Sequence, residues 1–385
     1  MIRIALLGAS GSIGAAALDL ARAYRDRIRL VSLAARKSDA ALVRAADEFG
    51  VRRIALVDPA AASRARAAWN GGEVLEGDQS LVELAEDEGA DVVVNAVVGS
   101  IGLAPTVAAL QRGKRVALAN KESVVLAGEL LTEIARRSGG IMLPVDSEHS
   151  GVFQCLGSLS ARDVRRVTLT ASGGPFLRRD PKSIQDSTPD EVLQHPTWSM
   201  GERITVDCAT LINKGFELIE ARWLFGLTPD QLSVVIHPQS IVHALVEFTD
   251  GSVVAQLSVP DMRLPLLYAI SYPERWSSEL PRLDLADFAS LTFEPPDPAR
   301  SPGLSLARRA LMTGSTAPAV LNGADEEAVR LFLSRKIRFG DLIPIVEEVL
   351  NAHRPAGPLT LESIRDADRW ARARLHEVAA HVIRG

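Results

Sequence analysis

The feature that most constrains the fold is a short apolar strand that runs directly into a glycine-rich turn and a helix. Residues 2–7 are strand-forming, Gly8, Gly11 and Gly14 follow at regular spacing, and an alanine-rich stretch comes next. A tight turn between a buried strand and a helix favours glycine, because the backbone there needs unusual dihedral angles or a close approach. The pattern predicts a strand–helix unit at the start of this sequence.

Short apolar runs and alanine-rich stretches keep alternating up to about residue 150. The expected strands are residues 2–7, 30–34, 54–57, 92–98, 116–119 and 141–145. Alternating strands and helices form a parallel sheet wound on both faces, and continuously apolar strands are buried on both sides. We therefore predict an α/β fold with an N-terminal Rossmann-like doubly wound parallel sheet in residues 1–150.

The pattern changes after residue 150. Further strands are expected at residues 167–170, 232–236, 241–248 and 253–259, and Asp250-Gly251 between the last two is typical of a hairpin turn. The polar, proline-broken residues 173–203 predict a mobile flap. Residues 151–277 are expected to form a central α+β catalytic domain that contains this flap.

The last part of the chain is predicted to be helical. Residues 278–303 are rich in proline and lack periodicity, which indicates an extended linker. Apolar residues then recur at helical spacing in residues 304–312, 319–334, 342–351 and 361–383. We expect residues 304–385 to form a C-terminal α-helical bundle.

Charge and cysteine content exclude several classes of protein. Lys and Arg number 43 and Asp and Glu 48, so the formal net charge is −5, which argues against a basic nucleic-acid-binding surface. Cys155 and Cys208 lie far apart in the sequence, so neither a disulfide framework nor a thiolate zinc site is indicated. The first residues are too short an apolar run for a secretory signal, and residues 92–111 fit a buried strand and helix better than a membrane span. We expect a cytoplasmic protein without nucleic-acid or membrane partners.

The glycine turn is a candidate dinucleotide site, because it leaves bare backbone amides at a helix N-terminus, where a pyrophosphate binds. Such glycines often serve only the turn, but this turn opens a strand–helix–strand series, which favours the nucleotide. Arg36, Lys37 and Ser38 follow the second expected strand, where an NAD site usually has an acid. Two cations and a hydroxyl suit a 2′-phosphate, so NADP(H) is favoured unless Arg36 and Lys37 are ordinary surface residues.

Two carboxylates follow the last strand of the first domain. At the end of a strand over residues 141–145, Asp146 and Glu148 point the same way and can bind one cation. Carboxylates without thiolate partners suit Mg²⁺ or Mn²⁺, with Co²⁺ as a further alternative. Solvated carboxylates are common in loops, so this pair alone is weak evidence.

A second polar group lies further along the chain. On a helix, Asn213 and Lys214 share one face with Glu217, and together they can bind a phosphate beside a metal. The alternative is a surface ion pair between Lys214 and Glu217.

The expected flap offers further polar groups. Ser172, before Gly-Gly-Pro, supplies a hydroxyl beside free amides, although a plain turn explains it nearly as well. His195 and Trp198 can close over a substrate and exclude water. For His237 and His243, which lie on or near strands, a satisfied core histidine is the expected role.

Eight segments carry a resemblance to a known family: GASGSIG at 8–14, LANKES at 118–123, LPVDSEH at 143–149, ASGGPF at 171–176, HPTWSMG at 195–201, NKGFE at 213–217, IHPQS at 236–240 and PDMR at 260–263. In these segments and their order the chain resembles the 1-deoxy-D-xylulose 5-phosphate reductoisomerases nearly end to end. The resemblance implies an NADPH- and metal-dependent rearrangement and reduction of 1-deoxy-D-xylulose 5-phosphate to 2-C-methyl-D-erythritol 4-phosphate, a step of non-mevalonate isoprenoid precursor biosynthesis. It also implies a homodimer with a small phosphosugar substrate.

The resemblance further implies roles for individual residues. The implied metal ligands are Asp146, Glu148 and Glu217. Catalytic roles fall to Lys121, Asp146, Glu148, His195 and Glu217. The residues expected to contact substrate are Lys121, Ser147, Glu148, Ser172, His195, Trp198, Cys208, Asn213, Lys214 and Glu217. Those expected to contact NADPH are Gly8, Ser10, Gly11, Ser12, Ile13, Gly14, Arg36, Lys37, Ser38, Asn120, Glu122 and Gly201.

The chain departs from the family pattern at a few positions. Cys208 stands where serine is usual, and a thiol donates a weaker hydrogen bond, so phosphate affinity is expected to be lower. Arg36 stands where glycine is usual and Ser38 where asparagine is usual, which affects how a 2′-phosphate is bound. Residues 323–326, Gly-Ala-Asp-Glu, replace Ala-Ala-Asn-Glu, and we expect no chemical effect.

Two other functions stay open on the sequence. One is a simpler NADP-dependent, metal-assisted sugar-phosphate dehydrogenase that does not rearrange the carbon skeleton. The other is a catalytically silent NADP-binding sensor or scaffold, against which the retained carboxylates, Lys214 and His195 argue.

Overall fold

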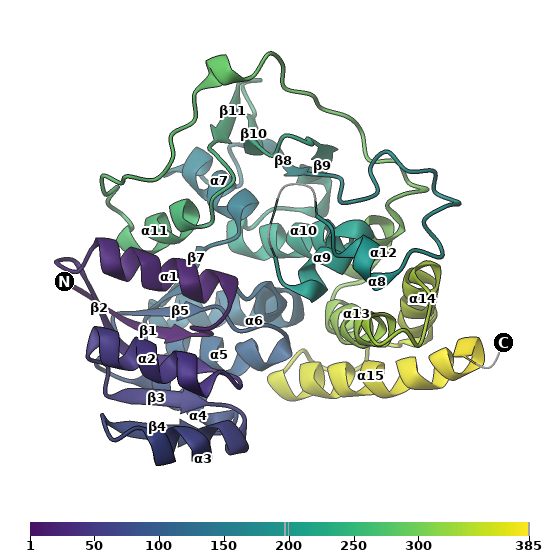
Figure 1. Ribbon diagram of the computed structural model, residues 1–385. Coiled ribbons are helices and arrows are strands. Elements are labelled where there is room, and N and C mark those ends of the chain that lie inside the picture. The colour runs from purple at the N-terminus through teal and green to yellow at the C-terminus, as the bar shows by residue number, and fades with distance from the viewer. Residues whose placement is uncertain (196–197, 199, 384–385) are drawn as a thin grey trace. The chain divides into compact units, whose positions relative to one another are not determined.

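The computed structural model of this chain describes residues 1–195, 198 and 200–383. The chain divides into two compact units (Figure 1). The first consists of Met1–Ser123, Leu131–Ser150 and Asp261–Leu280, and the second of Val124–Leu130, Gly151–Pro260 and Pro281–Gly385. Residues 261–280 are thus grouped with the N-terminal part, and the C-terminal helices are grouped with the central sheet. The functional division into domains 1–150, 151–277 and 304–385 with a linker at 278–303 stays a prediction.

A seven-stranded parallel sheet forms the core of the first unit, in the order β4-β3-β2-β1-β5-β6-β7. The strands are β1 (Ile2–Leu7), β2 (Ile28–Ala35), β3 (Arg53–Leu56), β4 (Glu73–Glu76), β5 (Val92–Asn95), β6 (Arg115–Leu118) and β7 (Ile141–Pro144). Every residue of β5 is buried, as its continuous valines predict. The doubly wound parallel sheet is confirmed, with β4 as a strand that the sequence pattern did not indicate.

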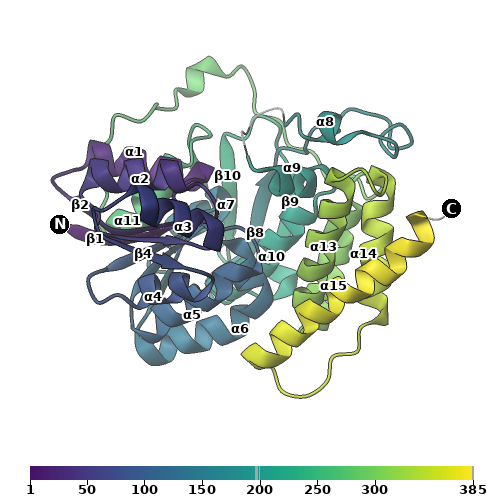
Figure 2. The same ribbon diagram turned by 60° about the horizontal axis from the view of Figure 1, so that its bottom comes forward.

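Helices cover both faces of this sheet. They are α1 (Ser12–Ala23), α2 (Asp39–Phe49), α3 (Pro59–Ala68), α4 (Gln79–Glu86), α5 (Leu103–Gln111) and α11 (Arg263–Ser271). Figure 2 shows α1, α2 and α3 above the strands and α4 and α5 below them. Helix α11 packs against α1, β6 and β7, which explains why residues 261–280 belong to this unit. Helix α7 (Ser147–Leu156) begins in the first unit and ends in the second, whereas α6 (Lys121–Ser138) belongs to the first unit except for Val124–Leu130.

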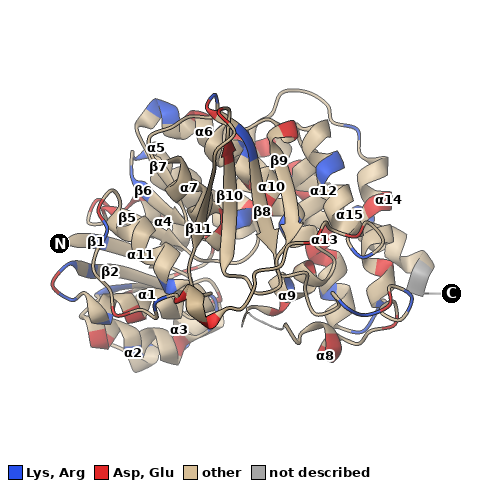
Figure 3. Ribbon diagram, turned by 90° about the horizontal axis from the view of Figure 1, so that it is seen from above, with Lys and Arg blue, Asp and Glu red and all other residues tan. Residues whose placement is uncertain are grey.

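The second unit contains a four-stranded mixed sheet (Figure 3). Its strands are β8 (Val164–Ala171), β9 (Leu232–Ile236), β10 (Val242–Phe248) and β11 (Val253–Leu257), in the order β11-β10-β8-β9. β10 and β11 form the expected antiparallel hairpin, with Gly251 at a φ of 89° in its turn. β8 and β9 are parallel.

The helices of the second unit are α8 (Pro189–Val192), α9 (Glu202–Ala209), α10 (Ile212–Phe225), α12 (Pro302–Thr313), α13 (Ala317–Leu333), α14 (Leu342–Ala352) and α15 (Leu361–Ile383). Helices α12 to α15 pack on one another as the expected bundle, and α10 packs against both α12 and the sheet. The segment before α12 is mostly extended, and Glu294 in it forms an isolated antiparallel bridge with Ile236. Among the described residues, no helix has the length and apolar character needed to cross a membrane.

Candidate active site

The glycine turn lies where the sheet order reverses. Strands β1 and β5 are neighbours, but the chain continues from them toward opposite edges, and open α/β sheets bind ligands beside such a point. Gly8 has a φ of 93°, and a Cβ on it would lie 2.4 Å from the Ala96 carbonyl oxygen. A Cβ on Gly14 would lie 2.2 Å from the Gly8 carbonyl oxygen. Glycine is therefore required at both positions, and α1 begins after Gly11 without a side-chain cap.

The residues after β2 present two unpaired cations. Arg36, Lys37 and Ser38 are all exposed, and Ser38 is the N-cap residue of α2. In the described part of the chain, neither Arg36 nor Lys37 forms an ion pair. Both cations follow the carboxyl end of a strand that neighbours β1, so they lie at the same sheet edge as the glycine turn.

Asn120 and Glu122, at the start of α6, shape the loop that follows β5. The Asn120 Nδ2 donates hydrogen bonds to the carbonyl oxygens of Val97 and Gly99, at 2.9 and 3.0 Å. The Gly99 backbone N–H donates to Glu122 Oε1 at 3.0 Å. The two predicted cofactor contacts therefore hold the backbone beside the switch point of the sheet.

The carboxylates after β7 lie together as predicted, with an oxygen of Asp146 within 4.8 Å of one of Glu148, but the local structure is not the predicted one. Because α7 begins at Ser147, Glu148 lies in the first turn of a helix and not on an extension of the strand, so the strand-end argument for its direction was wrong. A helix N-terminus nevertheless favours carboxylates, because its partial positive charge stabilises them. Lys121 Nζ lies 2.8 Å from Asp146 Oδ2, and Ser147 Oγ donates to Glu148 Oε2 at 2.6 Å. These four predicted site residues form one polar group in the first unit.

Ser172 and His195 meet in the second unit. The His195 Nε2 lies 3.0 Å from Ser172 Oγ, and the Trp198 backbone N–H donates to His195 Nδ1 at 2.9 Å. Burial lowers the pKa of His195, so the ring is neutral at physiological pH. Since Nδ1 accepts a hydrogen bond, the proton of the neutral ring is assigned to Nε2, which donates to the serine. Residues 196, 197 and 199 of this motif lie outside the described residues.

Asn213, Lys214 and Glu217 form a buried group on α10. Asn213 Nδ2 donates to Glu217 Oε1 at 2.7 Å, and Lys214 Nζ donates to Glu217 Oε2 at 2.5 Å. The side chains of Lys214 and Glu217 are only 4% and 1% exposed, so the alternative of a surface ion pair was wrong. A buried pair of this kind is held in one geometry, because losing either partner leaves an uncompensated charge.

Cys208 lies in the last turn of α9, next to the turn that carries Ser172. A Cβ on Gly174, whose φ is 70°, would lie 2.8 Å from the Cys208 carbonyl oxygen, so glycine permits this close approach. Gly201, a predicted cofactor contact, is exposed and is the N-cap residue of α9. Ser172, Cys208 and the α10 group therefore belong to one continuous part of the second unit.

Three contacts around the predicted site residues were not anticipated from the sequence. His149 is fully buried, with Nδ1 4.0 Å from Asp146 Oδ2. Its place in the LPVDSEH segment could have indicated this contact. Gly303 and Ala307 on α12 accommodate α10. The Trp198 ring lies 6.4 Å from that of His243. His237 and His243 are core histidines as expected, since His237 Nδ1 lies 2.9 Å from the Thr292 carbonyl oxygen and His243 Nε2 3.0 Å from Ser258 Oγ.

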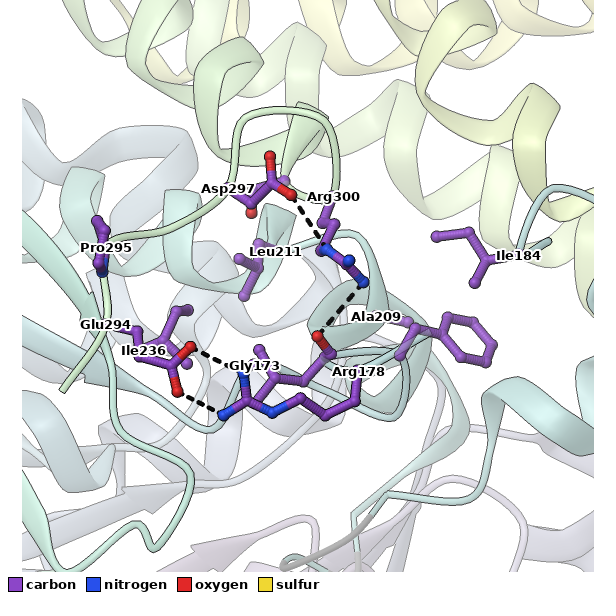
Figure 4. A pocket seen from close by; sticks show the side chains of 13 residues that line it. Gly173, Arg178, Ile184, Ala209, Leu211, Ile236, Glu294, Pro295, Asp297 and Arg300 are labelled. Carbon is purple, nitrogen blue, oxygen red and sulfur yellow. Dashed lines mark hydrogen bonds and ion pairs between the residues drawn. The ribbon is translucent and has the colours of Figure 1, made fainter. Parts of the chain in front are cut away.

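A cavity of about 300 Å³ lies beside Gly173 (Figure 4). Arg178 is paired with Glu294 across it, and Arg300 with Asp297. None of the predicted site residues lines this cavity. It is a gap between the start of the 173–203 segment and the 281–301 segment, and the predicted substrate contacts lie elsewhere.

The site residues divide between the units. Asp146, Glu148 and the glycine turn belong to the first unit, whereas Glu217 and Gly201 belong to the second. Within each unit the predicted residues gather as described above.

Comparison with known proteins gives a consistent result along the whole chain. A family model described as 1-deoxy-D-xylulose 5-phosphate reductoisomerase matches residues 4–128. Two models of C-terminal domains of the same enzyme match residues 142–225 and 257–374.

Relatives of the same name are similar over almost their full length. The 1-deoxy-D-xylulose 5-phosphate reductoisomerase of Thermomicrobium roseum is 50% identical over 384 residues, covering 99% of this chain and 98% of the relative. That of Chlorobium chlorochromatii is 47% identical over 374 residues, covering 97% and 98%.

Solved structures agree with this. A reductoisomerase from Zymomonas mobilis in complex with NADPH matches with a TM-score of 0.91 at 39% identity, covering 98% of this chain and 99% of that one. A reductoisomerase in complex with NADPH, fosmidomycin and magnesium matches with a TM-score of 0.94 at 39% identity, covering all of both chains. The chain belongs to the 1-deoxy-D-xylulose 5-phosphate reductoisomerase family.

Proposed function

We propose that this chain converts 1-deoxy-D-xylulose 5-phosphate to 2-C-methyl-D-erythritol 4-phosphate by a carbon-skeleton rearrangement followed by reduction with NADPH. The observation that carries the proposal is the near full-length match to reductoisomerases, one of them 50% identical. The polar groups around Asp146 and around Glu217 support it, because both are already formed within their units.

The residues of the first unit fit NADPH. The turn from Gly8 to Gly14 has no room for side chains at two positions and leaves backbone N–H groups for a pyrophosphate. The exposed cations Arg36 and Lys37 are suited to a 2′-phosphate, with Ser38 adding a hydroxyl. When bound, NADPH supplies the hydride that reduces the aldehyde product of the rearrangement.

The donor set Asp146, Glu148 and Glu217 fits a hard divalent cation, Mg²⁺, Mn²⁺ or Co²⁺, because all the donor atoms are carboxylate oxygens. One solved relative holds magnesium. When bound, the cation polarises the oxygens of the substrate's ketone and adjacent hydroxyl. Lys121, which pairs with Asp146, holds that carboxylate in place and lies beside the substrate.

The second unit binds the substrate phosphate in this proposal. Ser172 Oγ accepts hydrogen bonds from His195 and from the Gly174 N–H, so its own proton remains to be donated to a phosphate oxygen. Asn213 and Lys214 add an amide donor and a cation, and Cys208 adds a thiol. Binding energy from this remote group can then be used to close residues 173–203 over the reacting carbons, with Trp198 excluding water.

The remaining assignments follow the family. We propose that Ser147 also contacts the substrate, that Gly201 contacts the cofactor, and that the enzyme works as a homodimer in the cytoplasm on a small phosphosugar, without nucleic-acid or membrane partners.

The experiment is to follow NADPH oxidation with 1-deoxy-D-xylulose 5-phosphate, with and without Mg²⁺ or Mn²⁺, and to identify the product. Metal-dependent oxidation that yields the branched polyol phosphate supports the proposal. An unbranched product points to a simple dehydrogenase, and NADPH binding without turnover on any phosphosugar points to a sensor.

The variant Glu217→Gln tests the metal assignment. It should bind Mn²⁺ more weakly and turn over far more slowly, whereas Glu362→Gln, which changes an exposed carboxylate on α15, should behave as wild type. Wild-type turnover of the Glu217 variant would remove this residue from the metal site.

A further inference from the structure

Helix α9 joins two groups of proposed substrate residues and has little stability of its own. It has eight residues, and its N-cap residue, Gly201, makes no side-chain capping hydrogen bond. His195 and Trp198 precede it, Cys208 lies in its last turn, and α10 follows after one further turn. Helices this short are marginal in isolation, so tertiary contacts must determine where α9 lies.

Arg203 supplies the polar part of those contacts. Helix α9 packs against α13 (Figures 1 and 2), and the Arg203 guanidinium reaches three residues of that helix. Its Nη2 donates to Asn322 Oδ1 at 2.8 Å and lies 3.5 Å from Asp325 Oδ2. Its Nη1 donates to Glu326 Oε2 at 3.1 Å. A planar guanidinium with several fixed acceptors is held in orientation as well as in position.

The partners of Arg203 are themselves fixed. The side chains of Arg203 and Asp325 are 13% and 4% exposed, so leaving the buried guanidinium without hydrogen-bond acceptors is costly. Glu326 also accepts a hydrogen bond from Arg372 Nη2 at 3.0 Å, and Arg372 is bound in turn by Asp368 at 2.8 Å, both on α15. The network thus runs from α9 through α13 into α15.

The same guanidinium also faces the far end of α9. Its Nε lies 3.7 Å from Oδ2 of Asp207, one helical turn later and directly before Cys208. The contacts of the guanidinium given above join α9 to α13 and to the last turn of α9 itself, so they bear on the substrate through the position of α9.

We propose that Arg203 is a positioning residue for the substrate phosphate: by tying α9 to Asn322, Asp325 and Glu326, it sets the place of Cys208 and of the turn that leads into α10. The inference rests on the proposed function, since it assigns these residues to the phosphate. The proposal gives the C-terminal helices a specific part in substrate binding, because residues 322–326 hold Arg203.

The test compares Arg203→Lys with Arg372→Lys. Lysine keeps the charge but cannot reach Asn322, Asp325 and Glu326 together. We expect Arg203→Lys to raise KM for 1-deoxy-D-xylulose 5-phosphate about tenfold, because displacing a substrate-binding group by a fraction of an ångström weakens its contacts with the substrate. The KM for NADPH should stay unchanged. Arg372→Lys weakens the same network without touching α9. It should lower the melting temperature comparably and leave both KM values unchanged.

Two outcomes would overturn the inference: an unchanged substrate KM in Arg203→Lys, or an equal rise of that KM in both variants. If Arg203→Lys does not fold, Asn322→Ala replaces it. This variant removes Asn322 Oδ1, which accepts the 2.8 Å hydrogen bond from Arg203. It also removes Asn322 Nδ2, which has no hydrogen-bond partner among the described residues. The same rise in substrate KM is expected, and an unchanged KM again overturns the inference.

Failure of the proposed function is recognised separately. It would appear as absence of turnover in the wild-type enzyme. In that case the dissociation constant of inorganic phosphate, measured calorimetrically, takes the place of the substrate KM. Weaker phosphate binding in Arg203→Lys than in Arg372→Lys supports the positioning role, and equal binding in the two variants overturns it.

Discussion

Helices α10 and α12 of the second unit approach each other closely at Gly215 of α10. A Cβ on Gly215 would lie 2.2 Å from the Cβ of Ala307 on α12. Carbon atoms in contact are about 3.5–4.0 Å apart, so the variant Gly215→Ala must push the helices apart locally by about 1.5 Å. Overpacking of this kind costs about 1–3 kcal/mol, while replacing glycine by alanine within a helix gains at most about 1 kcal/mol. We expect a net loss of stability of up to about 2 kcal/mol.

The measurement is urea unfolding of Gly215→Ala, Ala307→Gly and the double variant. Removing the Cβ of Ala307 makes room for the one added at position 215. The double variant should therefore be more stable than the sum of the single changes predicts, with a coupling of at least about 1 kcal/mol. Lys214 directly precedes Gly215 in α10, so the substrate KM should rise in Gly215→Ala and recover in the double variant.

Two results would refute this reasoning. The first is a Gly215→Ala variant as stable as wild type with an unchanged substrate KM, because the helices would then have room that the structure does not show. The second is additivity within experimental error, which would mean that the two positions do not touch.

Three further predictions concern Asp325, Cys208 and the pair Arg36 and Lys37. Burial raises the pKa of Asp325 from 3.8 to about 6, so the ionised carboxylate is disfavoured in the folded protein. The protonated carboxyl therefore contributes to the free energy of unfolding below pH 3.8, and this contribution is lost as the pH rises through 6. Asp325→Asn should therefore be more stable than wild type at pH 8, by up to roughly 3 kcal/mol, with no gain near pH 4 in urea unfolding; an equal gain at both pH values would exclude a titration effect. Cys208→Ser should lower the substrate KM a few-fold without altering the KM for NADPH, because a hydroxyl donates a stronger hydrogen bond than a thiol; an unchanged substrate KM would place residue 208 away from the phosphate. Joint replacement of Arg36 and Lys37 by alanine should raise the KM for NADPH at least tenfold and leave that for NADH nearly unchanged, since each lost phosphate contact costs about 1.5–3 kcal/mol; equal effects on both cofactors would place the 2′-phosphate elsewhere.

Local signals predicted the first unit well and failed where they were weak. The strand, glycine turn and helix at residues 2–23 agree with the structure because the apolar run and the steric demand for glycine act locally. Strand β4 was missed because its four residues, Glu-Val-Leu-Glu, place only two apolar side chains at the edge of the sheet. The strand expected over residues 92–98 ends at Asn95, since the chain turns there toward Gly99, whose φ is 89°.

The candidate site required more than local signals. Helical spacing correctly put Asn213, Lys214 and Glu217 on one face, but it could not show that this face is buried, because burial depends on α12, about ninety residues later in the chain. The contacts of Arg203 with Asn322 and Glu326 are equally non-local, and each of these residue types occurs most often on surfaces. Sequence spacing thus identifies which residues can act together along one element, and packing between elements decides which of them do.

The discontinuity of the first unit has a consequence for synthesis of the protein. Its sheet is complete by Pro144, but α11, whose buried Leu266, Leu267 and Ile270 belong to the same unit, is made about 130 residues later. At roughly 5–20 residues per second, the ribosome delivers this helix on the order of ten seconds after the last strand. During that interval the nascent sheet exposes the apolar surface of β6 and β7 that α11 will cover. A fragment that stops near residue 150 would keep this surface exposed permanently, so it should aggregate when expressed alone, and linking α11 to its end should restore solubility.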